Sequence, residues 1–324
     1  MTQYIIRRCL WAVTMLILVI AIVFVIFFIL PGSAGRKGPA GISPVAVAIA
    51  GKQPTLELLR EIQDQLGLDD PVYTQFGRYV GNLVQGDLGY SFQTEEEVTS
   101  AILRRLPATV GLAIGASIIW LIMGVSIGIV SALNRRTIID RGSMLFALAG
   151  VSMPTFWLGL VLVFFFDARV GIYRTGNYVP ITEDPLQWLS VMWLPWFVLA
   201  FVTAAFYTRM VRGNMLEVEG EDYIRTARAK GLRRRSVVKH QLRSALTPVV
   251  TMYGLDVGIL LGGAVITETI FSLPGIGNMA VDAIRSGNLP VILGITLIAS
   301  TAVILMNLVV DIVYAILDPR VSYS

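Results

Sequence analysis

The sequence predicts an all-α membrane protein with six transmembrane helices, and three observations carry that prediction. Of the 324 residues, 55% are hydrophobic and 15% are charged, whereas a soluble domain carries about 25% charged residues. The mean hydropathy is +0.70. Six apolar runs lie close to the length of about 20 residues that a helix needs to cross a bilayer. Disorder is excluded, because it requires low hydrophobicity and high charge.

The six spans are expected at Cys9–Leu30, Ala108–Leu133, Ser143–Phe166, Leu189–Tyr207, Pro248–Ile270 and Pro290–Leu317. The first apolar run follows two basic residues, Arg7 and Arg8, as the apolar region of a signal peptide does. Gly32-Ser33-Ala34 would serve as its cleavage site. Its 22 apolar residues exceed the h-region of about 7–15 residues that signal peptides carry. We therefore expect an uncleaved first helix at 1–30, an extracytoplasmic loop at 31–107, and a core of five transmembrane helices at 108–324.

The distribution of Lys and Arg predicts which side of the membrane each loop faces. With the N-terminus inside, the inner segments hold 16 basic residues and the short outer segments hold 3. The long outer loop carries little weight, because loops beyond about 60 residues translocate largely regardless of charge. Both termini are therefore expected in the cytoplasm.

Loop 31–107 opens with a linker containing Pro31, Gly35, Gly38 and Pro39, whose residue types favour irregular backbone. Residues 55–66 then predict a short amphipathic helix, with Leu56, Leu59, Ile62 and Leu66 on one face. We expect the loop to form a cap on the bundle and not an independent domain.

Cytoplasmic loop 210–247 is too polar to cross the membrane and too short to fold alone. Its acidic residues precede its basic ones, which matches the helix macrodipole, and Gly231 suits the left-handed position that ends a helix. A helix–Gly–helix unit is therefore predicted. It could be a solvated positive loop, a nucleic-acid-binding helix-turn-helix that here lacks room for a supporting core, or a docking element for a cytoplasmic partner.

The stretch from Arg225 to Leu232 resembles the EAA loop of ABC importer permeases, in the variant of the dipeptide/oligopeptide/nickel branch. The resemblance covers the chain almost end to end, through Tyr4–Arg8 with Phe28–Gly32, Gly86–Phe92, Arg105–Thr109, Gly262–Ser272 with Pro274–Gly277, and Asp318–Arg320. It implies a type I ABC importer (MetI-like) permease fold with cytoplasmic coupling helices. It also implies a peptide substrate, with nickel or another metal chelate, glutathione or an oligosaccharide as alternatives.

The same resemblance implies the partners. They are a homologous sister permease forming a heterodimer, two ATPase subunits that bind ATP and Mg, and an extracytoplasmic solute-binding protein. This chain has no G-x-x-x-x-G-K-[ST] phosphate-binding loop, so it is expected to be a non-catalytic subunit without a cofactor of its own. The residues expected to contact an ATPase subunit are Glu221, Tyr223, Arg225, Thr226, Ala227, Arg228, Ala229, Lys230 and Gly231.

Polar residues inside apolar spans are candidates for the translocation pathway, because such residues are costly in a bilayer. Asp256 lies deepest in its span, whereas Glu268 and Asp311 lie nearer span ends, where hydration or helix packing would also explain them. Asn307 is expected to form an interhelical hydrogen bond. Gly254, Gly258 and Gly262 share one helix face, which predicts close packing against another helix, expected in the sister subunit.

Other functional classes fit the sequence less well. A chain with one cysteine, Cys9, and one histidine, His240, cannot build a zinc-type metal cluster, and it offers no pair of nucleophile and base. A proton-coupled secondary transporter could use Asp256, Glu268 or Asp311 as carriers, but the sequence shows no inverted repeat and predicts no pair of broken helices. Membrane lipid is the remaining expected contact, and nucleic acid is not expected.

Overall fold

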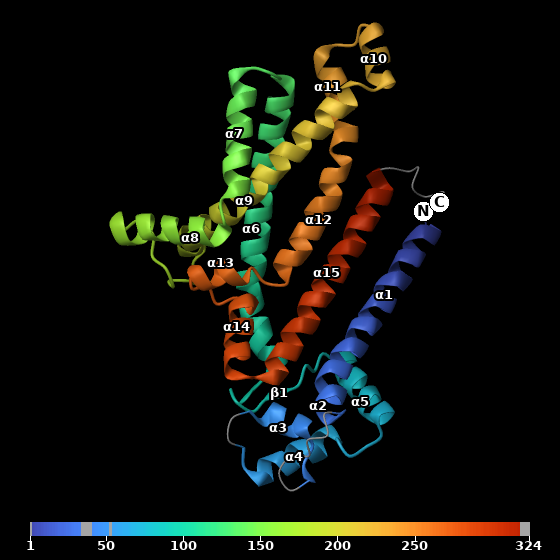
Figure 1. Ribbon diagram of the computed structural model, residues 1–324, viewed down its shortest axis with the longest axis vertical. Helices are drawn as coiled ribbons and strands as arrows, with labels where there is room; N and C mark the ends of the chain where they lie inside the picture. Colours follow the sequence, from blue (N-terminus) through green and yellow to red (C-terminus); the bar gives the residue numbers. More distant parts are fainter. Residues whose placement is uncertain (1, 34–40, 52–53, 318–324) are drawn as a thin grey trace.

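The structure is a computed structural model that describes residues 2–33, 41–51 and 54–317. In these ranges, helices at Gln3–Ile29, Val98–Leu133, Pro185–Glu219 and Leu289–Val313 are long and apolar enough to cross a membrane. Two bent helix pairs raise the number from four to six if each pair is one span: Ile138–Ser152 with Thr155–Arg169, and Arg234–Ala245 with Thr247–Leu261. The expected all-α membrane fold is confirmed (Figure 1). The linker residues Gly35, Gly38 and Pro39 and the tail motif Asp318–Arg320 lie outside the described residues.

The first helix leads directly into a small helical layer at one end of the bundle. The chain runs through α1 (Thr2–Phe24), the π-helical turn η1 (Val25–Ile29), α2 (Leu30–Ser33), α3 (Pro44–Ala50), α4 (Leu56–Leu66) and α5 (Val72–Val84). We call α3, α4 and α5 the cap. Thr55 accepts a hydrogen bond from the Leu58 N–H at 3.3 Å, so the helix predicted after Thr55 is confirmed.

The cap has its own apolar core, which joins it to the bundle. Val45 and Ile49 of α3 pack against Ile62 of α4, and Phe28 and Leu289 extend this core to the first and last helices. After α5 the chain forms a short antiparallel ladder, β1 (Tyr90–Ser91) with β2 (Glu96–Glu97). The cap is therefore anchored to the spans and does not stand alone.

Two long helices, α6 (Val98–Leu133) and α9 (Pro185–Glu219), form the centre of the bundle. Trp120 of α6 and Tyr207 of α9 are fully buried in the main apolar core. The Trp196 indole N–H donates to the Gly111 carbonyl oxygen at 2.9 Å, so the two helices approach closely where α6 has glycine.

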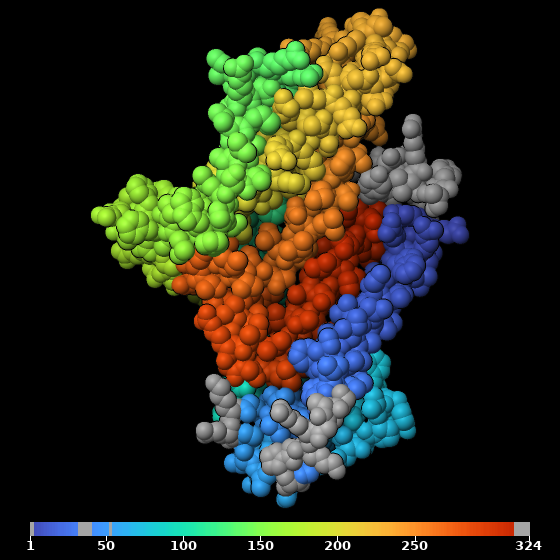
Figure 2. Space-filling model, viewed as in Figure 1, coloured from blue at the N-terminus to red at the C-terminus, as the bar shows by residue number. Residues whose placement is uncertain are grey.

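The predicted continuous span at Ser143–Phe166 is wrong. The structure has α7 (Ile138–Ser152), then α8 (Thr155–Val163) with the π-helical segment η3 (Phe164–Arg169), and the two halves meet at 95°. Pro154 explains the break, because proline lacks an N–H and disfavours helical backbone at the preceding residue. Segment 155–184 therefore projects sideways from the bundle (Figures 1 and 2).

The predicted fifth span, Pro248–Ile270, is interrupted as well. Helix α12 (Thr247–Leu261) stops at a Gly-Gly pair, where Gly263 has a φ of +111°, and α13 (Val265–Ile270) follows. The last elements are α14 (Ile276–Ser286) and α15 (Leu289–Leu317). The expectation that no broken helices occur was therefore wrong, and it no longer argues against a secondary transporter.

The stripe of Gly254, Gly258 and Gly262 does allow close helix packing, but within this chain. A Cβ atom at Gly254 would collide with Val310 of α15, and one at Gly258 would lie 3.1 Å from Met306 Cβ. The expectation that this face contacts a sister subunit is corrected, because α15 already covers it.

Helices α10 (Asp222–Ala229) and α11 (Arg234–Ala245) stand beyond the bundle at the end opposite the cap (Figures 1 and 2). We call them the α10–α11 unit. The start of α1 and the end of α15 lie together, joined by an ion pair of 3.1 Å between Arg8 and Asp311. Both lie away from the cap, in the half of the molecule that carries the α10–α11 unit (Figure 1).

Candidate functional site

The α10–α11 unit is built by local sequence signals. Glu221 adopts extended backbone before α10, and Gly231 has a φ of +74° just after it. The Gly231 N–H donates to the Arg228 carbonyl at 3.0 Å, and the Leu232 N–H donates to the Ala227 carbonyl at 3.2 Å, which closes the helix end. The predicted helix–Gly–helix arrangement is therefore confirmed.

Side chains of α9 and α11 fix the unit to the bundle. The Gln241 amide donates to the Met215 carbonyl at 3.0 Å, in a buried position. The Asn214 amide donates to the Ala245 carbonyl at 3.0 Å. Both acceptors are backbone carbonyls, so each hydrogen bond joins a side chain of one helix to the backbone of the other. The two bonds together hold α11 against the end of α9.

Helix α10 is held more lightly. Ile224 is its one buried residue. The Tyr223 hydroxyl donates to Ser244 Oγ at 2.8 Å, and Arg228 pairs with Glu219 at 2.7 Å, both at exposed positions. Exposed ion pairs contribute at most about 1 kcal/mol. The orientation of α10 therefore rests mainly on Ile224 and on the α9 end from which the helix starts.

The structure places most residues expected to contact an ATPase subunit on the exposed side of the unit. Ala227 is half-buried, and the exposed members are Glu221, Tyr223, Arg225, Thr226, Arg228, Ala229, Lys230 and Gly231. The side chains of Ala227 and Ala229 are small, and basic residues lie on either side of them. Nothing else in the described residues covers it.

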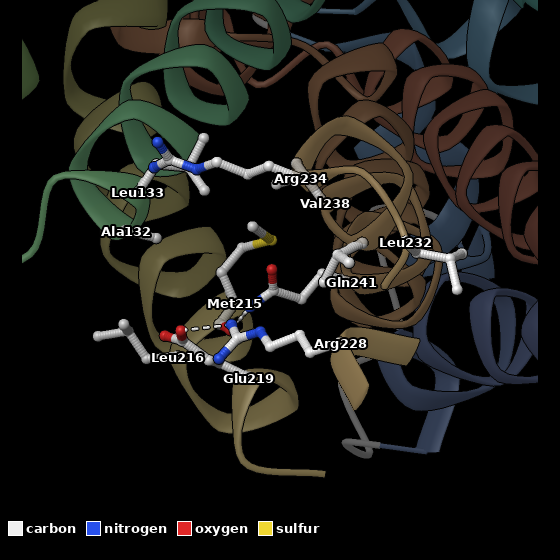
Figure 3. Close-up of a pocket in the computed structure, with 11 residues that line it drawn as sticks. Ala132, Leu133, Met215, Leu216, Glu219, Arg228, Leu232, Arg234, Val238 and Gln241 are labelled. Atoms are coloured by element: carbon white, nitrogen blue, oxygen red, sulfur yellow. Dashed lines mark hydrogen bonds and ion pairs between the residues drawn. The ribbon is translucent and has the colours of Figure 1, made fainter. Parts of the chain in front are cut away.

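A groove of about 290 Å³ lies between the unit and the ends of α6 and α9 (Figure 3). Ala132 and Leu133 line it from α6, and Val238 lines it from α11. The Arg234 side chain reaches across the groove toward Leu133 (Figure 3). The unit is therefore attached along α9 and separated from α6, which leaves room for it to move against α6.

One buried cluster beside this end was not predicted from the sequence. Asp140 of α7 accepts hydrogen bonds from Arg212 of α9 at 2.7 and 3.0 Å, and from Ser131 of α6 at 2.6 Å. The spacing Thr137-x-x-Asp140 was a visible signal for a helix start, and Thr137 does cap α7. No sequence pattern indicated that Arg212, 72 residues away, would pair with it.

Glu268 lies in the bundle, fully buried, where the sequence left hydration or packing open. Its carboxylate accepts hydrogen bonds from the Thr109 hydroxyl at 2.8 Å and the Asn278 backbone N–H at 2.8 Å. A Cβ atom at Gly275 or Gly277 would collide with this carboxylate. Packing therefore explains Glu268, and hydration does not.

Asp311 and Asn307 lie together on α15, facing α1. Asp311 is satisfied by the ion pair with Arg8, and Asn307 lines the same groove between the two helices. Among the described residues, no group forms a hydrogen bond with the Asn307 side chain. The interhelical hydrogen bond expected for Asn307 is therefore not found.

Asp256 lies half-buried where α12 meets α9. Its Oδ2 accepts a hydrogen bond from the Tyr207 hydroxyl at 2.6 Å. The structure thus places the four sequence-predicted pathway residues in three separate positions, with Asp256 near α9, Glu268 near α6, and Asn307 with Asp311 near α1.

A bundle of apolar helices, capped at one end and carrying a short exposed helical unit at the other, defines the chain as a multi-pass α-helical membrane protein. Residues 124–323 match the family model described as the binding-protein-dependent transport system inner membrane component. Residues 1–113 match the model for the N-terminal part of such membrane components. The chain belongs to this family, and it is an ABC importer permease.

Three relatives show how far the similarity extends. The di/tripeptide transport system permease protein DppB of Pseudomonas aeruginosa is 41% identical, over 87% of this chain and 90% of its own. The dipeptide transport system permease protein DppB of Alkalihalophilus pseudofirmus is 38% identical over the whole of both chains. The glutathione transport system permease protein GsiC of Escherichia coli O6:H1 is also 38% identical over the whole of both chains.

Proposed function

We propose that this chain forms half of the translocation pathway of an ATP-driven importer for dipeptides or oligopeptides. Full-length similarity to permeases named for dipeptide and di/tripeptide transport supports a peptide substrate. The glutathione permease is similar over its full length too, so glutathione, itself a small peptide, is the second candidate. Both candidates share the amino and carboxylate groups of a short peptide.

The proposed complex contains a homologous sister permease, two ATPase subunits that bind and hydrolyse ATP with Mg, and an extracytoplasmic solute-binding protein. The proposed site is the inner membrane of a prokaryote, with both termini and the α10–α11 unit in the cytoplasm. The excess of basic residues in these segments supports this orientation. So does the position of both helix ends in the half that carries the unit (Figure 1).

One observation supports the coupling role most directly. Helix α10 is exposed over most of its surface but follows α9 after only two residues, Gly220 and Glu221. In the proposed mechanism, an ATPase subunit holds residues 221–231, and its closure shifts α10. The Gln241 and Asn214 hydrogen bonds keep α11 on α9, so the shift passes to the long core helix and opens the pathway.

The proposed partners are tested by purifying the tagged chain in mild detergent and identifying the proteins that remain bound by mass spectrometry. The expected result is a sister permease and ATPases with a phosphate-binding loop. The complex is then reconstituted in vesicles with its binding protein, and uptake of dipeptides and of glutathione is measured. A chain that purifies reproducibly without any ATPase would contradict the importer assignment.

The coupling surface is tested by a matched pair of tryptophan substitutions. Ala229→Trp adds bulk to the exposed face of α10, and His240→Trp adds the same bulk to an exposed position of α11. We expect Ala229→Trp to lower ATP-driven uptake at least about tenfold, since losing ~1.4 kcal/mol of docking free energy has that effect. His240→Trp should leave uptake close to wild type. Equal uptake by both variants would contradict docking through α10.

A further inference from the structure

The carboxylates in and beside the spans are satisfied in different ways, and one of them is left incomplete. Asp140 has Arg212, and Asp311 has Arg8. Glu268 is enclosed by a hydroxyl and backbone N–H groups. Asp256 receives a single hydrogen bond, from Tyr207. Among the described residues, its Oδ1 has no hydrogen-bond partner and the carboxylate has no basic partner.

An unpaired carboxylate in a membrane span is costly, and such groups mark ion or substrate pathways or pair with another charge. A purely structural contact to Tyr207 would not need the negative charge, because an asparagine oxygen accepts the same hydrogen bond. A cation from outside the described residues would therefore stabilise the charged form of Asp256.

The surroundings of Asp256 favour an ammonium ion. The rings of Tyr207 and Tyr253 lie 6.4 and 6.0 Å from that of Trp120, between centroids. Aromatic faces attract ammonium groups, more strongly where water is excluded. Among the described residues, no group accepts a hydrogen bond from the buried Trp120 indole N–H, and the Tyr253 hydroxyl donates to Ser117 Oγ at 3.1 Å. Carboxylate, aromatic rings and polar groups thus gather where α6, α9 and α12 meet.

Asp256 also lies beside an open side of its helix. Gly254 and Gly258 face α15, whereas Leu255 and Ile259 are 36% and 64% exposed. Successive residues of a helix are about 100° apart, so Asp256 lies between the exposed stripe and α9. Its half-buried carboxylate can therefore be reached from the open side of α12.

We propose that Asp256, which accepts a hydrogen bond from Tyr207 near the rings of Trp120 and Tyr253, recognises the ammonium group of the transported peptide as it passes through the membrane. The inference rests on the proposed peptide transport, because every unmodified peptide carries an α-ammonium group. Tyr207 orients the carboxylate through Oδ2, and Oδ1 remains available to accept the ammonium N–H. The contact is transient, as transport requires. It differs in this from the fixed ion pairs of this chain, whose basic partner lies within the chain itself.

The test compares wild type with Asp256→Asn in vesicles that contain the complete complex and its binding protein. Asparagine keeps the acceptor for Tyr207 and removes only the charge. We expect uptake of a dipeptide with a free amino group to fall at least about tenfold, which corresponds to ~1.4 kcal/mol. ATP hydrolysis stimulated by the loaded binding protein should change less than twofold, because that stimulation depends on the two ends of the molecule. Asp256→Glu should recover part of the uptake.

A charge-rescue experiment separates recognition from structure. The chain has one native cysteine, so Cys9→Ser gives a cysteine-free background. In that background, Asp256→Cys is modified with an anionic sulfonatoethyl or a cationic aminoethyl methanethiosulfonate of similar size. We expect the anionic reagent to restore uptake severalfold and the cationic reagent to restore none. Equal rescue by the two reagents would overturn the proposal.

The remaining outcomes are also decisive. Unchanged peptide uptake by Asp256→Asn would overturn the proposal while leaving peptide transport intact. Loss of the sister permease from the purified Asp256→Asn complex would show that the carboxylate pairs with a basic residue of that subunit, which would overturn substrate recognition. If wild type takes up no peptide at all, the proposed function itself fails, and the inference fails with it.

Discussion

Glu268 is the clearest case of a residue whose role depends on neutral donors. A buried carboxylate without a basic partner is tolerated only when hydrogen bonds surround it. Thr109 donates its hydroxyl to Glu268 and accepts the Ile276 N–H at 2.9 Å. One threonine of α6 therefore holds both the carboxylate of α13 and the first turn of α14.

Removing the Thr109 hydroxyl tests this arrangement. Thr109→Val keeps the shape but leaves the Ile276 N–H and one Glu268 oxygen without a partner, which costs about 1–3 kcal/mol for each unsatisfied group. Thr109→Ser keeps the hydroxyl and should cost less than ~1.5 kcal/mol. Thermal unfolding of the purified complex in detergent checks the order. Equal stabilities of the Val and Ser variants would show that the hydroxyl contributes nothing.

At this scale, the sequence identified the polar residues but not their partners. Asp256 and Glu268 stand out because each is a charge within an apolar run. Thr109 lies 159 residues before Glu268, and Tyr207 lies 49 before Asp256. Pairings over such separations follow from helix packing, and no periodicity or local spacing within one sequence records them.

At the scale of elements, an ion pair joins two helices at the end that carries the α10–α11 unit. Asp140, at the start of α7, pairs with Arg212 of α9 and also accepts the Arg136 N–H at 2.9 Å. The pair fixes the short turn between α6 and α7 against α9, less than two helical turns before α9 ends. Movement of α9 in this region should therefore carry α7 with it.

A double-mutant cycle measures this connection. Asp140→Asn or Arg212→Met alone leaves the other charge without its partner, and breaking a buried pair costs about 3–5 kcal/mol. We expect a somewhat smaller loss, because the Arg212 side chain keeps 23% exposure. The double variant should be no less stable than the worse single variant. Additive losses in denaturant titrations would show that the two residues do not interact.

At the scale of elements, the sequence predicted the spans and the helix–Gly–helix unit because both follow local rules. Apolar length defines a span, and Gly231 ends a helix. The breaks in two spans were missed although their signals were present. Pro154 and the pair Gly262-Gly263 lie inside apolar runs, and hydropathy counts residues without testing whether one helix can include them. Helix α8 points away from the bundle because of the angle between α7 and α8, and no sequence pattern predicts that angle.

The orientation of the whole molecule is open to a direct test with the cysteine-free Cys9→Ser chain. Tyr73 of α5 is 79% exposed in the cap, and Lys239 is exposed on α11. In the proposed topology, a membrane-impermeant maleimide labels Tyr73→Cys in intact cells and labels Lys239→Cys only after permeabilisation. Both should react equally in opened membranes. Labelling of Lys239→Cys from outside intact cells would reverse the topology.

Helix α9 has 35 residues without a break and is therefore about 52 Å long, well beyond the hydrocarbon core of about 30 Å. If a helix of this length tilts by about 10° about its middle, its two ends move by roughly 4.5 Å in opposite directions. The number of residues in the helix also sets the direction in which the following segment points, since each inserted residue rotates that segment about the helix axis by about 100°. One extra residue between Arg212 and Glu219 would thus swing the α10–α11 unit to another side of the bundle while every contact nearer the cap stayed in place.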